Sequence, residues 1–416
     1  MFKPKSEFTR NILTLMTGTT IAQAIPIAIS PILTRLYTPE DFGIFALFFS
    51  LTMIFGSIVN ARYEMAIMLP VKDDEALNIA ALGILIAIVL SVILFILVFF
   101  FNQVIVKLLN NKDIEIWLYL LPLSVLLIGI FNILSYLNTR MKYYKDISKA
   151  LIYKSVVITS VQLLVGYIYQ GVSGLISGLI LSNFFGNIKL FKNILLQHNF
   201  FTSISIQKII IVAVRYSNFP KFSVWSALAS SSSQHLVSIL IASFYSIASL
   251  GYYSLSEKVL GSPSAIIGRS IGQVYYQQGS QEKLSTGKVV NTFKSTLIKL
   301  ILIGIPFFGI LFFIVEDLFV IVFGEHWRIA GQYSKILLPL FLVRFVVSPL
   351  TLTAIIYEKN ILDLCFQLFL LALIIFLLFF SENINSFLVS ISFIISIYYL
   401  VYLLILFKIS QQESSR

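Results

Sequence analysis

The sequence predicts an all-α, polytopic membrane protein with about twelve transmembrane helices. The chain is 58% hydrophobic and only 12% charged, whereas about a quarter of the residues of a soluble domain are charged. Its mean hydropathy is +0.92. Apolar runs of roughly twenty residues recur along the chain, and each is long enough to cross the hydrocarbon core of a bilayer as a helix.

A partial repeat suggests that the chain consists of two related halves. Residues 34–47 join two apolar runs, and Pro39, Glu40 and Asp41 supply the turn chemistry between them. Residues 242–255 repeat the pattern weakly, with three identities in the aligned pairs Tyr37/Tyr245, Gly43/Gly251 and Leu47/Leu255. Three identities are compatible both with chance and with an internal duplication, which is a common build of secondary transporters.

Composition excludes several other classes of protein. The basic N-terminus leads into an apolar segment that is too long for a signal sequence, so we expect a retained first span. A single cysteine, Cys365, allows neither an intramolecular disulfide nor a cysteine-based metal site. We expect no cofactor and no nucleic acid, and we assign the net charge of +11 to membrane topology and anionic headgroups.

Hydropathy divides the chain into two sets of six spans. We predict a six-helix bundle over 1–191, a cytoplasmic amphipathic linker over 192–219 and a second six-helix bundle over 220–416. In the linker, Lys208, Arg215 and Lys221 alternate with isoleucine and valine, which predicts a helix on the membrane surface. The spans are expected near 11–36, 42–64, 78–101, 116–137, 151–169, 172–191, 220–241, 250–273, 293–315, 333–356, 361–380 and 386–407.

Orientation follows from the basic residues. With an even number of spans both termini share one side, and that side holds 22 of the 30 lysines and arginines. The other side holds Arg35, Lys107, Lys112, Arg328 and Lys335. By the positive-inside rule, both termini are predicted to be cytoplasmic.

Three cations, Lys258, Arg269 and Arg344, lie within predicted spans, where charge is costly unless it faces a cavity or a partner. Lys258 and Arg269 share one stripe of the eighth span with serines, Gly272 and Gln273, which predicts a wet lumen that accepts negative charge. The alternative is that Lys258 pairs with neighbouring Glu257 while Arg269 reaches the headgroups.

Polar stripes on the first and seventh spans also point to a cavity. Gln23 lies on the first stripe, and Gln234 lies on the second, which is otherwise made of serines. Small polar residues also hold membrane helices together, so packing is the alternative explanation. Arg62 and Glu64 end the second span. If that helix continues to Leu69, they lie at the cytoplasmic mouth of the lumen; otherwise they form a surface ion pair.

The chain lacks the motifs of an ATP-driven motor or a hydrolase. Gly287 and Lys288 are not part of a phosphate-binding loop, because no glycine precedes them at the required spacing and no serine or threonine follows. We therefore do not expect an enzyme.

At four places the sequence resembles the Wzx-type oligosaccharide flippases of the multidrug/oligosaccharidyl-lipid/polysaccharide exporter superfamily. These are Leu-Thr-Arg-Leu-Tyr-Thr-Pro-Glu-Asp-Phe-Gly at 33–43, Ala-Arg-Tyr-Glu-Met-Ala-Ile-Met-Leu-Pro at 61–70, Gly-Val-Ser-Gly-Leu-Ile-Ser-Gly at 171–178 and Gly-Tyr-Tyr-Ser-Leu-Ser-Glu-Lys-Val-Leu-Gly-Ser-Pro at 251–263.

The resemblance implies two six-helix bundles around a central cationic cavity. It also implies that an undecaprenyl-pyrophosphate-linked oligosaccharide crosses the bacterial inner membrane by alternating access, for surface polysaccharide such as O-antigen of lipopolysaccharide or capsule. The implied partners are this lipid-linked substrate, membrane lipids, a polysaccharide polymerase and a chain-length regulator. Lys258, Arg269, Arg62, Glu64, Gln23, Arg344 and Gln234 are the candidate substrate-binding residues, and Glu257 is the candidate for ion coupling.

Two other functions remain open. A cation-coupled drug or metabolite exporter of the same superfamily would use an intramembrane carboxylate, for which Glu257 and Asp363 are candidates. A membrane-embedded polymerase or ligase would need a large external loop with basic and acidic residues, but the longest one here, 316–332, is short.

Overall fold

The computed structural model describes residues 7–195 and 204–413, with the side chains of 7–13, 195, 263–267, 269, 270 and 360 left out. These residues form helices and connecting turns, without a strand, so the prediction of an all-α membrane protein is confirmed. The chain divides into two compact units, Met1–Ile247 and Ala248–Arg416. The predicted linker residues 196–203 lie outside the described residues.

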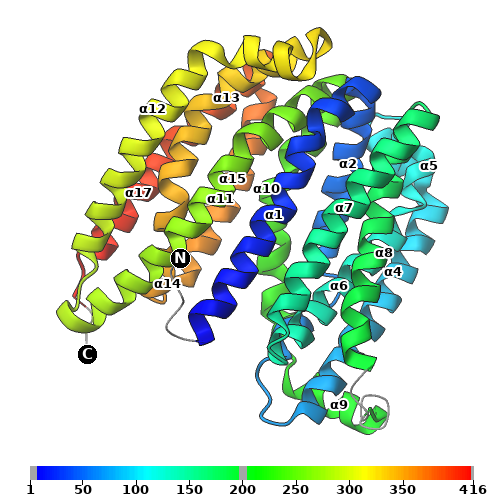
Figure 1. Cartoon of the computed structure of the whole chain (residues 1–416), viewed down its shortest axis with the longest axis vertical. Coiled ribbons are helices and arrows are strands. Elements are labelled where there is room, and N and C mark those ends of the chain that lie inside the picture. The colour runs from blue at the N-terminus through cyan, green and yellow to red at the C-terminus, as the bar shows by residue number, and fades with distance from the viewer. Residues whose placement is uncertain (1–6, 196–203, 414–416) are drawn as a thin grey trace. The chain divides into compact units, whose positions relative to one another are not determined.

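In the first unit, long helices run side by side (Figure 1). Helix α7 packs between α1 and α8, α4 packs on α6, and α10 packs on α2. The bounds are α1 (Glu7–Leu36), α2 (Pro39–Gly56), α3 (Tyr63–Ala66), α4 (Asp73–Leu108), α5 (Glu115–Leu118), α6 (Leu121–Arg140), α7 (Tyr144–Ile168), α8 (Ser173–Leu195), α9 (Ile206–Arg215), the π-helix η1 (Phe219–Ser223) and α10 (Val224–Phe244).

In the second unit, α12 packs on α13, and α13 packs on α17. The bounds are α11 (Ile247–Thr286), α12 (Val290–Phe323), η2 (Glu325–Trp327), α13 (Arg328–Val347), η3 (Ser348–Thr351), α14 (Leu352–Ile356), α15 (Asn360–Phe379), α16 (Ile384–Ser390), η4 (Ile391–Ile395) and α17 (Ser396–Ser410).

Each of the twelve predicted spans overlaps one long helical segment. Ten segments among the described residues are long and apolar enough to cross a membrane. The other two are α10 and α11, in which serines, glutamines and charged residues replace aliphatic side chains. The two long helices that fall short of this criterion are therefore those that carry the predicted stripes of Gln234 and of Lys258.

The connection between α1 and α2 forms as its sequence predicts. Thr38 caps α2 because its hydroxyl accepts a hydrogen bond from the backbone N–H of Asp41, and the Asp41 carboxylate accepts one from the N–H of Thr38. Pro39 occupies the first helical turn, where its missing N–H has no cost. The preceding Tyr37 donates a hydrogen bond of 2.6 Å to the carbonyl oxygen of Gln162, which fixes this turn to α7.

The second span ends earlier than the sequence suggested. Helix α2 stops at Gly56, and Ala61 and Arg62 have φ angles of 48° and 64°. The alternative in which this helix continues to Leu69 is therefore wrong, because a left-handed backbone cannot belong to an α-helix. Glu64 lies instead in the short helix α3, between the spanning helices α2 and α4.

Candidate functional site

Charged side chains lie inside the helix bundle of the second unit. Glu257 and Lys258 are on α11, and Arg344 is on α13. The Arg344 guanidinium interacts electrostatically with the Glu257 carboxylate and with the hydroxyl groups of Tyr253 and Tyr399. The ring of Phe341 lies 5.6 Å from the guanidinium carbon of Arg344. Three helices, α11, α13 and α17, thus contribute to one polar cluster.

Lys258 is a cation without an acidic partner in this cluster. No charged group among the described side chains compensates its ammonium, and Glu257 interacts with Arg344. Consecutive residues of a helix point about 100° apart, which explains why Glu257 and Lys258 do not pair. The alternative that the two neutralise each other is therefore wrong. An uncompensated cation within a membrane bundle is costly unless an anion or water reaches it.

The charged side chains of the cluster are not fully buried, because Glu257, Lys258 and Arg344 each keep an intermediate exposure. Two cations and one carboxylate give the cluster a net positive charge, which suits a phosphate group or another anion.

Arg269 lies farther along the same helix. Helix α11 is unbroken from Ile247 to Thr286, so the Cα atoms of Lys258 and Arg269 are about 16 Å apart along its axis. The side chain of Arg269 lies outside the described residues, and its contacts stay a prediction.

In the first unit, Arg62 and Glu64 form an ion pair of 3.2 Å between Nη1 and Oε1. The two side chains are 27% and 4% exposed, so the pair is not the surface bridge that the sequence allowed. Burial raises the pKa of Glu64, and the opposing effect of Arg62 is smaller. Glu64 Oε2 and Arg62 Nε are buried without a hydrogen-bond partner among the described residues.

Two neighbouring side chains hold the segment that carries this pair. The hydroxyl group of Tyr63 donates a hydrogen bond of 2.8 Å to the carbonyl oxygen of Ala213 on α9. Arg140, at the end of α6, forms a 2.9 Å ion pair with Asp73 and donates to the carbonyl oxygens of Ile67 at 3.0 Å and Val71 at 3.3 Å. Sequence analysis counted Arg140 only as a topology signal, because its three partners are distant in the sequence.

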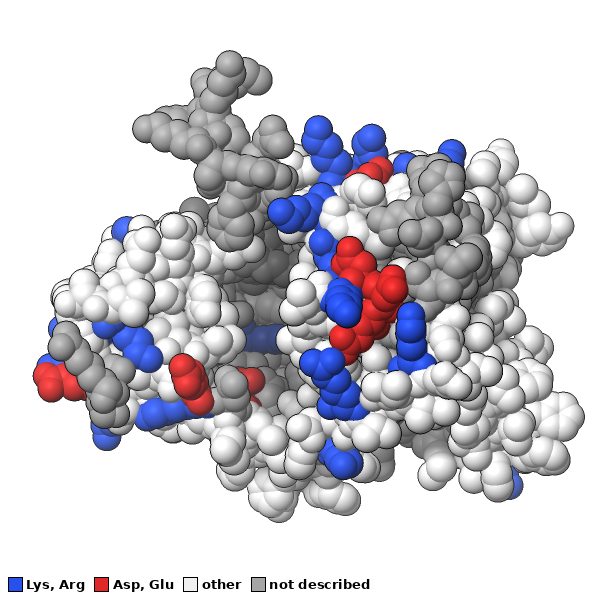
Figure 2. Space-filling view, turned by 90° about the horizontal axis from the view of Figure 1, so that it is seen from below, with Lys and Arg blue, Asp and Glu red and all other residues white. Residues whose placement is uncertain are grey.

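Ion pairs also fix α9 beside this segment. Asp74 and Glu75 lie in the first turn of α4. Lys208 Nζ is 3.7 Å from Asp74 Oδ2, and Arg215 Nη1 is 2.6 Å from Glu75 Oε1. Figure 2 shows an end of the molecule at which acidic side chains (red) and basic side chains (blue) lie next to one another. The outward face of α9 carries exposed Ile206, Ile210, Ile211 and Val214. This helix has the two-sided character that the sequence predicted, and its place on a membrane surface stays a prediction.

The polar stripes of the first and seventh spans are both in the first unit. Gln23 is half-buried on α1, one residue after Ala22, whose carbonyl oxygen accepts a 2.6 Å hydrogen bond from Ser155 on α7. Gln234 is exposed on α10 and reaches the hydroxyl of Ser230 at 3.5 Å. No hydrogen bond or ion pair among the described residues joins either glutamine to Arg62 or Glu64. The structure thus assembles one ion pair, Arg62 with Glu64, in the first unit, and an electrostatic interaction between Glu257 and Arg344 in the second.

Sequence analysis missed one intramembrane cation, Lys154. Helix α7 begins at Tyr144, so Lys154 lies almost three turns inside it and not at its mouth. Its ammonium donates a 2.7 Å hydrogen bond to Asn183 and lies 3.8 Å from the centre of the Phe131 ring. Lysines 145 and 149 suggested a loop, but lysine is a good helix former, and α7 simply extends beyond the apolar run.

Comparison with known proteins agrees with this architecture. The family model described as polysaccharide biosynthesis protein matches residues 32–331. A search of curated proteins found no significant match. Among solved structures, the lipid II flippase MurJ in an inward closed conformation is similar, with 13% identity, a TM-score of 0.70 and coverage of 97% of this chain and 89% of that chain.

Two MATE transporters are similar as well. A Vibrio cholerae MATE transporter, VcmN, has 11% identity and a TM-score of 0.60, over 98% of this chain and 97% of that one. An inward-facing MATE family transporter of the MOP superfamily has 15% identity and a TM-score of 0.58, over 95% and 93%. At such identities the likeness shows the fold alone. Because the family model covers most of the chain, this protein belongs to the polysaccharide biosynthesis protein family and has the fold of MOP superfamily transporters and flippases.

Proposed function

We propose that this protein is a flippase that moves undecaprenyl-pyrophosphate-linked oligosaccharide repeat units across the bacterial cytoplasmic membrane by alternating access, for the synthesis of surface polysaccharide. The observation that carries the proposal is Lys258, an uncompensated cation within the bundle of a polysaccharide biosynthesis protein. A diphosphate supplies the negative charge that this site lacks.

The other candidate residues receive roles from their chemistry. Arg269 and Arg344 join Lys258 as phosphate ligands, because a guanidinium can donate two parallel hydrogen bonds to phosphate oxygens. Gln23 and Gln234 offer amide groups to the glycan. Arg62 and Glu64, between spanning helices, lie at the cytoplasmic entrance in the proposed orientation, which places both termini in the cytoplasm. No enzymatic step is required of any residue.

The experiment is complementation of a strain that lacks this gene. The Lys258→Ala protein should reach the membrane in normal amount but restore little surface polysaccharide, and lipid-linked oligosaccharide should accumulate in the inner leaflet. Lys335→Ala is the matched control, because Lys335 lies on α13 of the same unit and is already paired with Glu316 at 3.0 Å. Full complementation by Lys258→Ala would argue against the proposed phosphate site.

A second candidate function is a cation-coupled exporter of the same superfamily. It is favoured by Asp363, a carboxylate in the first turn of α15 that accepts a hydrogen bond of 3.5 Å from the Tyr402 hydroxyl on α17. That function predicts normal surface polysaccharide in the deletion strain and increased retention of a drug or metabolite. Both Asp363→Asn and Glu257→Gln would then abolish export.

A further inference from the structure

The C-terminal residues 410–413 cross one end of the second unit, beside a pocket. The pocket has a volume of about 810 Å³ and lies among the last turns of α11, the turn after it, the end of α14 and the C-terminal residues. Ser280 and Lys283 line one side, Ile356 and Glu358 line another, and Glu413 contributes a wall from the C-terminal segment. One wall of this pocket is therefore a residue that belongs to no helix.

The root of this segment is buried and firmly bound. Ser410 and Val289 have no exposed surface. The carbonyl oxygen of Ser410 accepts hydrogen bonds from the backbone N–H of Val289 at 3.0 Å and from the Tyr357 hydroxyl at 3.1 Å. Buried hydrogen bonds of this kind are costly to break, because the groups left behind are unsatisfied. Gln412 is held as well, because its carbonyl oxygen accepts a hydrogen bond of 3.2 Å from the Tyr357 hydroxyl and its side-chain oxygen accepts one of 2.5 Å from the Lys359 ammonium. The segment therefore stays in place as far as Gln412.

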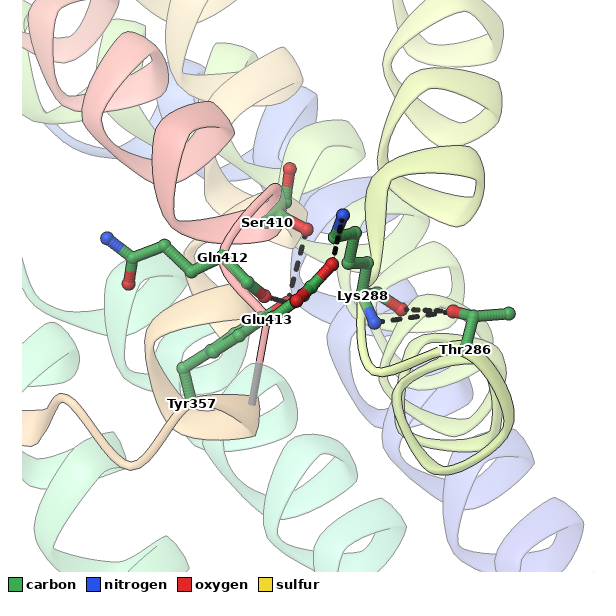
Figure 3. Close-up of polar contacts among 6 residues, drawn as sticks. All are labelled: Thr286, Lys288, Tyr357, Ser410, Gln412 and Glu413. Atoms are coloured by element: carbon green, nitrogen blue, oxygen red, sulfur yellow. Dashed lines mark hydrogen bonds and ion pairs between the residues drawn. The ribbon is translucent and has the colours of Figure 1, made fainter. Parts of the chain in front are cut away.

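The tip of the segment is held differently (Figure 3). Glu413 is 77% exposed and forms an ion pair of 2.8 Å with Lys288, which is 42% exposed. Lys288 is fixed on its turn, because its N–H and its carbonyl group both bond to the hydroxyl of Thr286. Exposed ion pairs stabilise only weakly and are screened by salt. The ion pair between Glu413 and Lys288 can thus open while Lys288 keeps its bonds to Thr286 and the segment keeps its bonds at Ser410.

We propose that residues 410–413 are a strap with a root fixed from Ser410 to Gln412 and a releasable tip at Glu413, and that the tip narrows the mouth of the pocket. Release of Glu413 from Lys288 removes one wall and widens that mouth. Lys288 lowers the pKa of the Glu413 carboxyl, so the pair persists at neutral pH, and ionic strength is the variable that releases it. This device is independent of the molecule that the protein transports.

The test measures access to the pocket in the purified full-length protein in detergent. In a Cys365→Ser background, Ser280→Cys places a thiol inside the pocket, and its rate of reaction with a charged, membrane-impermeant maleimide is recorded. Lys288→Glu and Glu413→Lys should each raise the rate roughly two- to fivefold at low salt. The double exchange Lys288→Glu/Glu413→Lys should restore the parental rate. High salt should raise the rate of the parental protein and leave the single variants unchanged.

Glu358→Gln supplies the matched control. Glu358 lines the same pocket and is exposed, so its neutralisation changes the local potential at the thiol as Glu413→Gln does. The strap predicts a faster reaction for Glu413→Gln than for Glu358→Gln. Equal rates for these two variants, or a double exchange that reacts as fast as the single ones, would overturn the proposal. Neither outcome bears on the phosphate site at Lys258.

Discussion

Arg62 and Glu64 form their 3.2 Å ion pair across a backbone that is left-handed at Ala61 and Arg62. Residues other than glycine adopt this conformation at a cost of about 1–3 kcal/mol, and it persists only where the surroundings impose it. The surroundings here are the Tyr63 hydrogen bond and the three contacts of Arg140. A strained turn that presents a buried carboxylate is typical of a functional site. Glu64 is then the functional group, and Arg140 holds the turn in place.

Glu64→Gln should change the dependence of stability on pH. Burial raises the pKa of Glu64 above the usual 4.5, so ionisation costs more in the folded protein than in the unfolded chain. The contribution of Glu64 to stability is then fully present below pH 4.5 and is lost as the pH rises through the raised pKa. Relative to Glu64→Gln, the natural protein should therefore unfold at progressively lower temperature from pH 4 to pH 7. Thermal unfolding in detergent measures this, and the opposite slope would show that Arg62 dominates.

Arg140→Ala should destabilise the protein by about 1–3 kcal/mol, because the buried carbonyl oxygen of Ile67 loses its donor and the turn loses its clamp. The Arg140 side chain is only 13% exposed. Arg215→Ala is the control, since Arg215 is 60% exposed in its pair with Glu75 and should cost less than about 1 kcal/mol. Arg140→Lys should resemble Arg140→Ala, because an ammonium cannot reach three acceptors in a fork. Equal unfolding temperatures for Arg140→Ala and Arg215→Ala would exclude a clamp.

The helices could be predicted from the sequence because hydropathy and turn chemistry are local. Pro39 and Asp41 were sufficient to place the start of α2. The end of α2 was not predicted although it falls on Gly56, because a single glycine inside an apolar run is tolerated in a helix. There the amide of Asn60 donates a 3.2 Å hydrogen bond to the carbonyl oxygen of Gly83 on α4. A contact between distant segments therefore decides the backbone.

The candidate site was predictable as a set of charges but not as a set of pairs. An intramembrane cation is visible in any sequence, so Lys258 and Arg344 were found. Glu257 lies beside Lys258 in the chain, yet it interacts with Arg344, which only the packing of α11 against other helices determines. Lys154 was missed for another reason, because it stands at the start of its predicted span, 151–169, and was counted with the cytoplasmic basic residues, whereas its helix begins at Tyr144.

Gly174→Ala should destabilise the first unit by about 1–3 kcal/mol through overpacking. An added methyl group would overlap the Tyr37 hydroxyl. Gly174→Ala combined with Tyr37→Phe should recover part of the loss, although the bond to Gln162 is then absent. Gly309→Ala is a control of opposite sign, because open space surrounds Gly309 in α12 and alanine favours a helix by about 0.5–1 kcal/mol. Thermal unfolding of the three variants tests the assignment, and a neutral Gly174→Ala would contradict it.

Reporter fusions should give the orientation that the basic residues predict. Fusions at Asn111 and Asn383 should report the external side, and fusions at Lys145 and Lys208 should report the cytoplasm. An alkaline phosphatase and green fluorescent protein pair measures both. An external signal at Lys208 would contradict the twelve-span topology, because α9 directly precedes the first helix of the predicted second half.

Substitutions of Glu257 and Arg344 should separate stability from transport. Arg344→Gln removes the cation that faces Glu257 and leaves a carboxylate surrounded by protein. We expect a loss of about 1–3 kcal/mol, less than for a fully buried pair, because both side chains keep some exposure. The double variant Glu257→Gln/Arg344→Gln removes both charges together, so neither is left without the other, and it should unfold near the natural temperature.

Surface polysaccharide then reports the second role. If Arg344 also binds phosphate, the stable double variant should still fail to complement the deletion strain. Glu257→Gln alone keeps Arg344 and should complement better than the double variant. Complementation by the double variant at the natural level would show that Arg344 serves only to neutralise Glu257. The phosphate ligands would then be sought at Lys258 and Arg269, whose charges this pair of variants leaves intact.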